Sequence, residues 1–130
     1  MLKVTVRKVG GIVVIRCVGR IVAGEDFRAA RDGIGHAGGN RLIVVDLAEV
    51  DAIDAAGLGL LVSLNTSAAI AGVELKLMNP SERTRELLTL TRLDSVLEIC
   101  SPRDAEWLGA RATQPGGRTL LEFELRGFDR

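Results

Sequence analysis

Three aspartates near the end of one apolar run are the side chains best placed to do chemistry. Asp46 closes the run at residues 42–46, and Asp51 and Asp54 follow it. Carboxylates grouped at a strand end can hold a metal ion or accept a phosphoryl group. However, the lysine and hydroxyl residues of a phosphoaspartate site do not follow in order, and His36 is the only histidine. We therefore expect no catalytic residues, no metal site and no cofactor.

The segment that begins at Asp54 is the most informative part of the chain. A buried strand is predicted before it and a helix is predicted to begin at about residues 55–57. A helix N-terminus has unpaired N–H groups and a partial positive charge, so it can bind phosphate or be capped by a carboxylate. One interpretation is structural, with Asp54 as the cap and Gly57 and Gly59 allowing close packing. The other is a binding surface.

The helix that follows has two apolar stripes. Leu60, Leu61 and Leu64 share one face with Ala68 and Ala71, and this face is predicted to be the core. A second stripe contains Leu58, Val62, Asn65 and Ala69. It either widens the buried face or forms a small exposed apolar patch for a partner. The candidate contact residues are therefore Asp54, Ala55, Ala56, Gly57, Leu58, Gly59 and Val62.

The surrounding pattern alternates strands with helices. Strands are predicted at residues 3–9, 12–18, 42–47, 73–78 and 96–99, and helices at 25–38, 57–71, from Asn79 onward, and at 101–111. Asn79 is the predicted cap of the third helix, with Pro80 and Glu82 in its first turn. This order predicts an α/β domain at residues 1–112, followed by an extension at 113–130 that forms an extra strand or a flexible arm.

Composition narrows the function. Lys+Arg and Asp+Glu both number 17, and the formal net charge is zero, which argues against nucleic acid as the main partner. No apolar run is long enough for a membrane span or a signal peptide, so a cytoplasmic protein is expected. Cys17 and Cys100 lie in apolar stretches and are predicted to be reduced core thiols.

With these elements in place, the chain resembles the STAS domain of bacterial anti-sigma factor antagonists. The resemblance rests on residues 42–59, which end in Asp54-Ala-Ala-Gly-Leu-Gly59 where the family has Asp-Ser-Ser/Thr-Gly-Leu-Gly, and it extends over about residues 2–110. It implies a mixed, mostly parallel sheet of about five strands with about four helices packed mainly on one face. It also implies a partner, a serine kinase that doubles as an anti-sigma factor.

Position 55 departs from that family pattern. The resemblance implies that the kinase phosphorylates the residue after the motif aspartate, which is Ala55 here and has no hydroxyl. Ser63, Thr66 and Ser67 lie farther along the helix and are interpreted as ordinary helix residues. The expected function is binding without this switch. The alternatives are a STAS subunit of an ABC-type lipid transporter and a nucleotide or small-ligand sensor, and a homodimer is left open.

Overall fold

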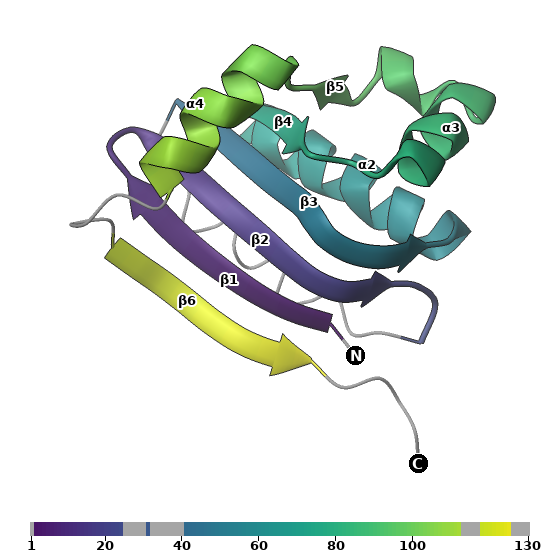
Figure 1. Cartoon of the computed structure of the whole chain (residues 1–130), viewed down its shortest axis with the longest axis horizontal. Coiled ribbons are helices and arrows are strands. Elements are labelled where there is room, and N and C mark those ends of the chain that lie inside the picture. Colours follow the sequence, from purple (N-terminus) through teal and green to yellow (C-terminus); the bar gives the residue numbers. More distant parts are fainter. Residues whose placement is uncertain (1, 25–30, 32–40, 113–117, 126–130) are drawn as a thin grey trace.

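A computed structural model describes residues 2–24, 31, 41–112 and 118–125 of the chain. The described strands form one six-stranded sheet in the order β5-β4-β3-β2-β1-β6, with helices on both faces (Figure 1). Strands β2 to β5 are parallel to one another, and β1 pairs antiparallel with both β2 and β6. The strands are β1 (Leu2–Val9), β2 (Ile12–Ile21), β3 (Leu42–Ile53), β4 (Glu74–Met78), β5 (Glu98–Ile99) and β6 (Arg118–Leu125).

This architecture confirms the predicted α/β fold with a mixed, mostly parallel sheet. The sixth strand is β6. It lies in the segment that the sequence predicted to be either an extra strand or a flexible arm. It pairs with β1 along most of its length, with Val4 opposite Phe123. The predicted helix at residues 25–38 lies outside the described residues, apart from Arg31.

The main core lies between the sheet and two helices, α2 (Ala55–Ile70) and α3 (Glu82–Leu90). Successive side chains of a strand point to opposite faces. In β2, Val13, Ile15 and Cys17 therefore face these helices. Val14 faces the other way, into a smaller apolar cluster that includes Leu108 of α4 (Pro102–Ala112). Figure 1 shows α4 in front of the sheet and α2 behind it.

The start of α3 corrects one prediction from the sequence. The cap is Ser81, whose Oγ accepts the Thr84 N–H at 3.1 Å, and not Asn79. Asn79 has φ 55°, a left-handed conformation that asparagine tolerates better than most residues. The chain therefore turns at Asn79 and Pro80 before the helix begins.

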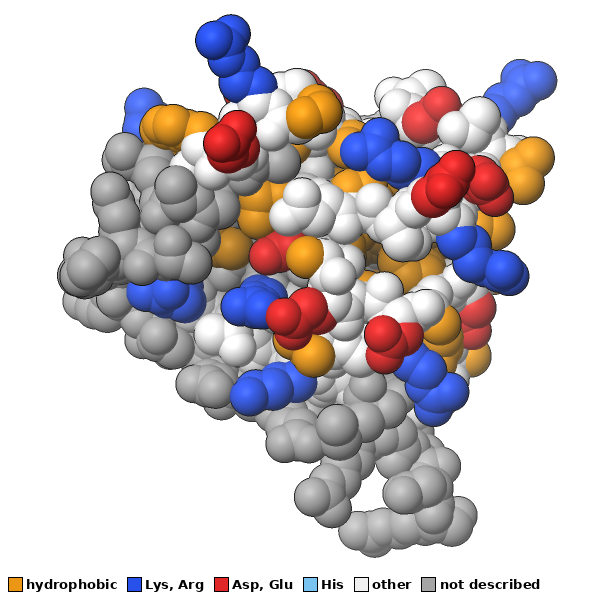
Figure 2. All heavy atoms as spheres, viewed as in Figure 1, with side chains coloured by type: hydrophobic (Ala, Val, Ile, Leu, Met, Phe, Trp, Pro, Cys, Tyr) orange, Lys and Arg blue, Asp and Glu red, His pale blue; other side chains and the backbone are white. Residues whose placement is uncertain are grey.

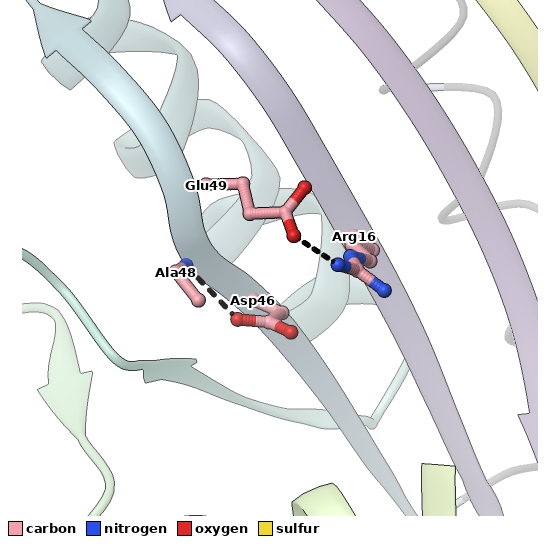
Figure 3. Close-up of polar contacts among 4 residues, drawn as sticks. All are labelled: Arg16, Asp46, Ala48 and Glu49. Atoms are coloured by element: carbon pink, nitrogen blue, oxygen red, sulfur yellow. Dashed lines mark hydrogen bonds and ion pairs between the residues drawn. The ribbon is translucent and has the colours of Figure 1, made fainter. Parts of the chain in front are cut away.

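Strand β3 contains two bulges that bend it toward the start of α2. Opposite β2, the register passes from Arg16↔Asp46 to Val18↔Glu49, which leaves one extra residue on β3. The Asp46 carboxylate accepts the Ala48 N–H at 3.0 Å within this first bulge, and Arg16 pairs with Glu49 across it (Figure 3). A second extra residue lies between Val50 and Ala52. Bulges increase the local bend and twist of a strand.

Candidate functional site

Asp54 joins the end of β3, the end of β2 and the start of α2. Its Oδ1 accepts the Gly57 N–H at 3.0 Å, which makes it the predicted helix cap. Its Oδ2 accepts the Ala23 N–H at 2.8 Å, just beyond β2. The hydrogen bonds from Ala23 and Gly57 stabilise the carboxylate and lower the pKa of Asp54. The carboxylate is therefore ionised and held by two backbone donors.

The two glycines of the motif have different environments. A Cβ on Gly57 would lie 1.9 Å from the Ile21 carbonyl oxygen, so only glycine fits where α2 meets the end of β2. At Gly59 a Cβ would meet none of the described residues within 4 Å, and Gly59 is exposed. Close packing therefore explains Gly57 but does not explain Gly59.

The burial of Leu58 favours the first of the two interpretations of the second apolar stripe, a wider buried face, and corrects the prediction of Leu58 as a contact residue. Leu58 is 5% exposed and belongs to the main core, and Val62 is half-buried against that core. The apolar face of α2 is therefore wide, because the helix packs against the curved sheet with more than one row of side chains. Ala71, predicted to be in the core, is exposed beyond the helix end. Leu58 and Gly57 are therefore buried residues that hold the start of α2 in place beneath the accessible part of the motif.

The motif residues that remain accessible form a small surface at the start of α2. We call it the α2 head, and it consists of Asp54, Ala55, Ala56 and Gly59. Asp54 is half-buried and the other three are exposed. Helix α2 itself contains no charged residue from Ala55 to Ile70, whereas α3 and α4 both carry charges. The exposed face of a surface helix normally carries polar and charged residues, so the lack of charge on α2 sets it apart from α3 and α4.

The electrostatics of the α2 head do not favour an anionic ligand. The ionised Asp54 already accepts an N–H of the first turn of α2, and its negative charge opposes a phosphate there. The other two aspartates are separate from this contact: Asp46 accepts from Ala48 in the bulge, and Asp51 is exposed. Within the described residues, no three His, Cys, Asp or Glu side chains are arranged to hold a metal. His36 lies outside those residues.

Two residues of the site were not found by sequence reasoning. Ile21, at the end of β2, lies against Gly57, and Ala23, just beyond β2, donates to Asp54. Both residues are more than thirty positions earlier in the chain than the motif residues they contact. The parallel pairing of Ile21 with Ile53 brings them there.

The comparison with protein families agrees with the fold and the motif. The family model for the STAS domain matches residues 3–105. The chain belongs to the STAS domain family. Within it, 62 residues are 34% identical to the Thermotoga neapolitana protein named "Putative anti-sigma factor antagonist TM1081 homolog". The match covers 48% of this chain and 54% of that protein, so the chain spans about half the length of the curated relative.

Solved structures show the same fold in different settings. An anti-sigma factor antagonist from Mycobacterium paratuberculosis superimposes with a TM-score of 0.62 at 21% identity, over 86% of this chain and 95% of that one. The murine anion transporter Slc26a9 gives a TM-score of 0.63 at 16% identity, over 85% of this chain and 22% of that one. This STAS domain therefore shares its fold with free-standing and transporter-attached relatives. In the described residues, no helix is both long and apolar enough to cross a membrane.

Proposed function

We propose that this STAS domain is a cytoplasmic protein-binding regulator of the anti-sigma factor antagonist kind, not an enzyme. Its partner is a serine kinase that also acts as an anti-sigma factor. The surface that binds this partner is the α2 head, with Val62 at its margin. The resemblance of the motif and the antagonist relative support the choice of partner class.

The environment of Gly59 is the observation that carries this proposal. A glycine inside a helix costs about 1 kcal/mol relative to alanine, and no packing against the residues that the structure describes requires one at this position. Together with Ala55 and Ala56, it leaves the first turns of α2 without protruding side chains. A partner's backbone can therefore approach the helix closely, and little side-chain entropy is lost on binding.

Ala55 removes the phosphorylation switch from this surface. An alanine resembles an unphosphorylated serine in size and charge but cannot accept a phosphoryl group. The α2 head consequently stays in the unphosphorylated, binding-competent form in the presence of kinase and ATP. Regulation, where it exists, acts on the partner or on the amount of this protein.

A transporter-attached role would use the same surface with a different partner. The fold likeness to Slc26a9 is compatible with a STAS subunit that binds the ATPase of a lipid transporter. A nucleotide-sensing role is less favourable, because Asp54 carries its charge at the helix start where a phosphate would bind. Binding assays with a kinase partner and with a transporter ATPase distinguish the first two roles.

Two arginine substitutions on the same exposed side of α2 test the proposed surface. Ala56→Arg places a long cation on the α2 head, and Thr66→Arg places one ten residues farther along, about 15 Å away at 1.5 Å per residue. We expect Ala56→Arg to weaken binding of the kinase at least tenfold, and Thr66→Arg to leave it within about twofold. Equal effects of the two variants, with both proteins folded, would contradict the proposal.

A further inference from the structure

The end of β2 is tied to the start of α2 through Ile21 and Ala23. The Ile21 carbonyl oxygen accepts the Asp54 N–H at 3.4 Å, and Gly57 packs directly against it. Two residues farther along the chain, the Ala23 N–H donates to Asp54 Oδ2 at 2.8 Å. Ala23 is therefore held within one hydrogen bond of the α2 head.

Ala23 and Gly24 resemble the α2 head in character. Both residues are exposed, and neither has more than a methyl group as a side chain. Gly24 has φ 90°, a left-handed conformation that favours glycine, and a Cβ there would meet none of the described residues within 4 Å. A partner that approaches the α2 head closely can continue over these two residues, because neither position carries a long or charged side chain.

A carboxylate at position 54 allows both of its hydrogen bonds to form. Asp54 accepts the Gly57 N–H through Oδ1 and the Ala23 N–H through Oδ2, so its two oxygens bind two different segments. An asparagine has one acceptor oxygen, and its amide group only donates. Asparagine caps a helix as well as aspartate does, but its amide group would face the Ala23 N–H and this hydrogen bond would be lost. The hydrogen bond to Ala23 is therefore separable from helix capping.

We infer that Asp54 is a positioning residue, whose hydrogen bond with Ala23 places residues 23–24 beside the α2 head as a second segment of the partner-binding surface. The identity of the partner, a serine kinase, rests on the proposed function. The partner then contacts two segments that are 31 positions apart in the chain. Without the hydrogen bond, residues 23–24 have to be ordered when the partner binds, which lowers the affinity.

Asp54→Asn tests the positioning role without removing the helix cap. Amide hydrogen exchange, resolved by NMR for each residue, measures the Ala23 and Gly57 N–H groups in the protein alone. We expect exchange at Ala23 to become at least about tenfold faster, and exchange at Gly57 to change less than about threefold. Unchanged exchange at Ala23 would overturn the inference, whether or not a kinase binds.

Kinase binding tests the second segment of the surface. We expect Asp54→Asn to weaken binding at least about fivefold, because residues 23–24 are no longer held in place. Ala23→Arg keeps the N–H group but adds a long cation, and we expect it to weaken binding at least about tenfold. This variant also decides the question if Asp54→Asn does not fold. Native affinity in the folded variants would overturn the inference, even with faster exchange at Ala23.

Ala48→Arg is the matched control for Ala23→Arg. Ala48 is also an exposed alanine whose N–H donates to an aspartate carboxylate, that of Asp46. It precedes Asp54 by six residues, a distance of up to about 20 Å along β3. Asp46 faces away from α2, because its neighbour Leu47 belongs to the main core. Figure 2 shows this side of the sheet, where acidic and basic side chains are interspersed.

The control separates a local effect of the added arginine from a general one. Ala48→Arg should change kinase binding less than about twofold. Equal weakening by Ala23→Arg and Ala48→Arg, with both proteins folded, would overturn the second segment. A native protein that binds no kinase would overturn the proposed function together with this segment, whereas the exchange result would still report on Asp54 itself.

Discussion

Gly57 and Ile21 are in contact so close that the helix residue can have no side chain. A Cβ at position 57 would lie 1.9 Å from the Ile21 carbonyl oxygen, and backbone cannot move aside as a flexible side chain can. We expect Gly57→Ala to lower the free energy of unfolding by about 1–3 kcal/mol, despite the better helix propensity of alanine. Urea unfolding monitored by circular dichroism measures this change.

Gly59→Ala is the matched comparison for Gly57→Ala. The site around residue 59 is open, so the substitution should raise the free energy of unfolding by up to about 1 kcal/mol. If both alanine variants were equally destabilised, the distinction between a structural and a binding glycine would be wrong.

Leu58 and Ala56 are two residues apart but differ in burial. Leu58→Asp places a charge in the main core, and we expect it to cost more than about 4 kcal/mol and to unfold the protein. Ala56→Asp substitutes an exposed residue and should leave the thermal unfolding midpoint nearly unchanged. A folded Leu58→Asp protein that has lost only its partner would place Leu58 on the binding surface after all.

Asp54 should make stability depend on pH in the acidic range. Its pKa is lowered in the folded state from an ordinary value of 3.8, so the ionised form stabilises the fold above that value. This stabilisation is lost as the pH falls through the folded pKa. Asn also caps helices but does not titrate, so Asp54→Asn should give a flatter dependence of stability on pH below about 4. Chemical denaturation at several pH values measures the free energy of unfolding of both proteins. If this free energy changed equally with pH in the two proteins, the prediction would be wrong.

Cys17 should be unreactive in the folded protein. Burial, with a smaller contribution from the Asp46 charge, raises the pKa of its thiol to about 12, so almost no thiolate exists at neutral pH. Because folding raises the pKa of the Cys17 thiol, the protonated thiol contributes fully to stability below the unfolded pKa of 9.0. This contribution is lost as the pH rises toward the folded pKa of about 12. Ellman's reagent should react with Cys17 only after unfolding in urea. Rapid reaction of the native Cys100→Ser variant, in which Cys17 is the only cysteine, would show that Cys17 is accessible.

The predictable parts of this fold are those that depend on residues close together in sequence. The apolar run at residues 12–18 indicated a buried strand, and the β-branched run at residues 42–46 indicated a central one. Asp54 was predictable as a cap because a cap acts on N–H groups only three residues away. The predicted cap of α3, Asn79, was wrong because serine caps helices as well as asparagine does, and the left-handed turn at Asn79 that delays the helix start to Ser81 is not visible in the sequence pattern.

The less predictable parts depend on pairing between distant segments. The bulges of β3 are defined by its pairing with β2. The contact of Gly57 with Ile21 requires β2 and β3 to end side by side, with Ile21 opposite Ile53. The burial of Leu58 depends on how the curved sheet packs against α2. The periodicity of one helix cannot predict this packing. Of the predicted contact residues, Ala55, Ala56 and Gly59 are therefore the ones that the structure leaves exposed.

The role of Ala55 is tested most directly by exposing the protein to its kinase and ATP, followed by intact mass spectrometry and a binding assay on the same samples. An Ala55→Ser variant, which restores the missing hydroxyl, is the positive control. The account predicts that the native protein gains no phosphate at residues 55–67 and stays bound, while Ala55→Ser is phosphorylated and released. Stoichiometric phosphate on the native segment, together with loss of binding, would contradict it.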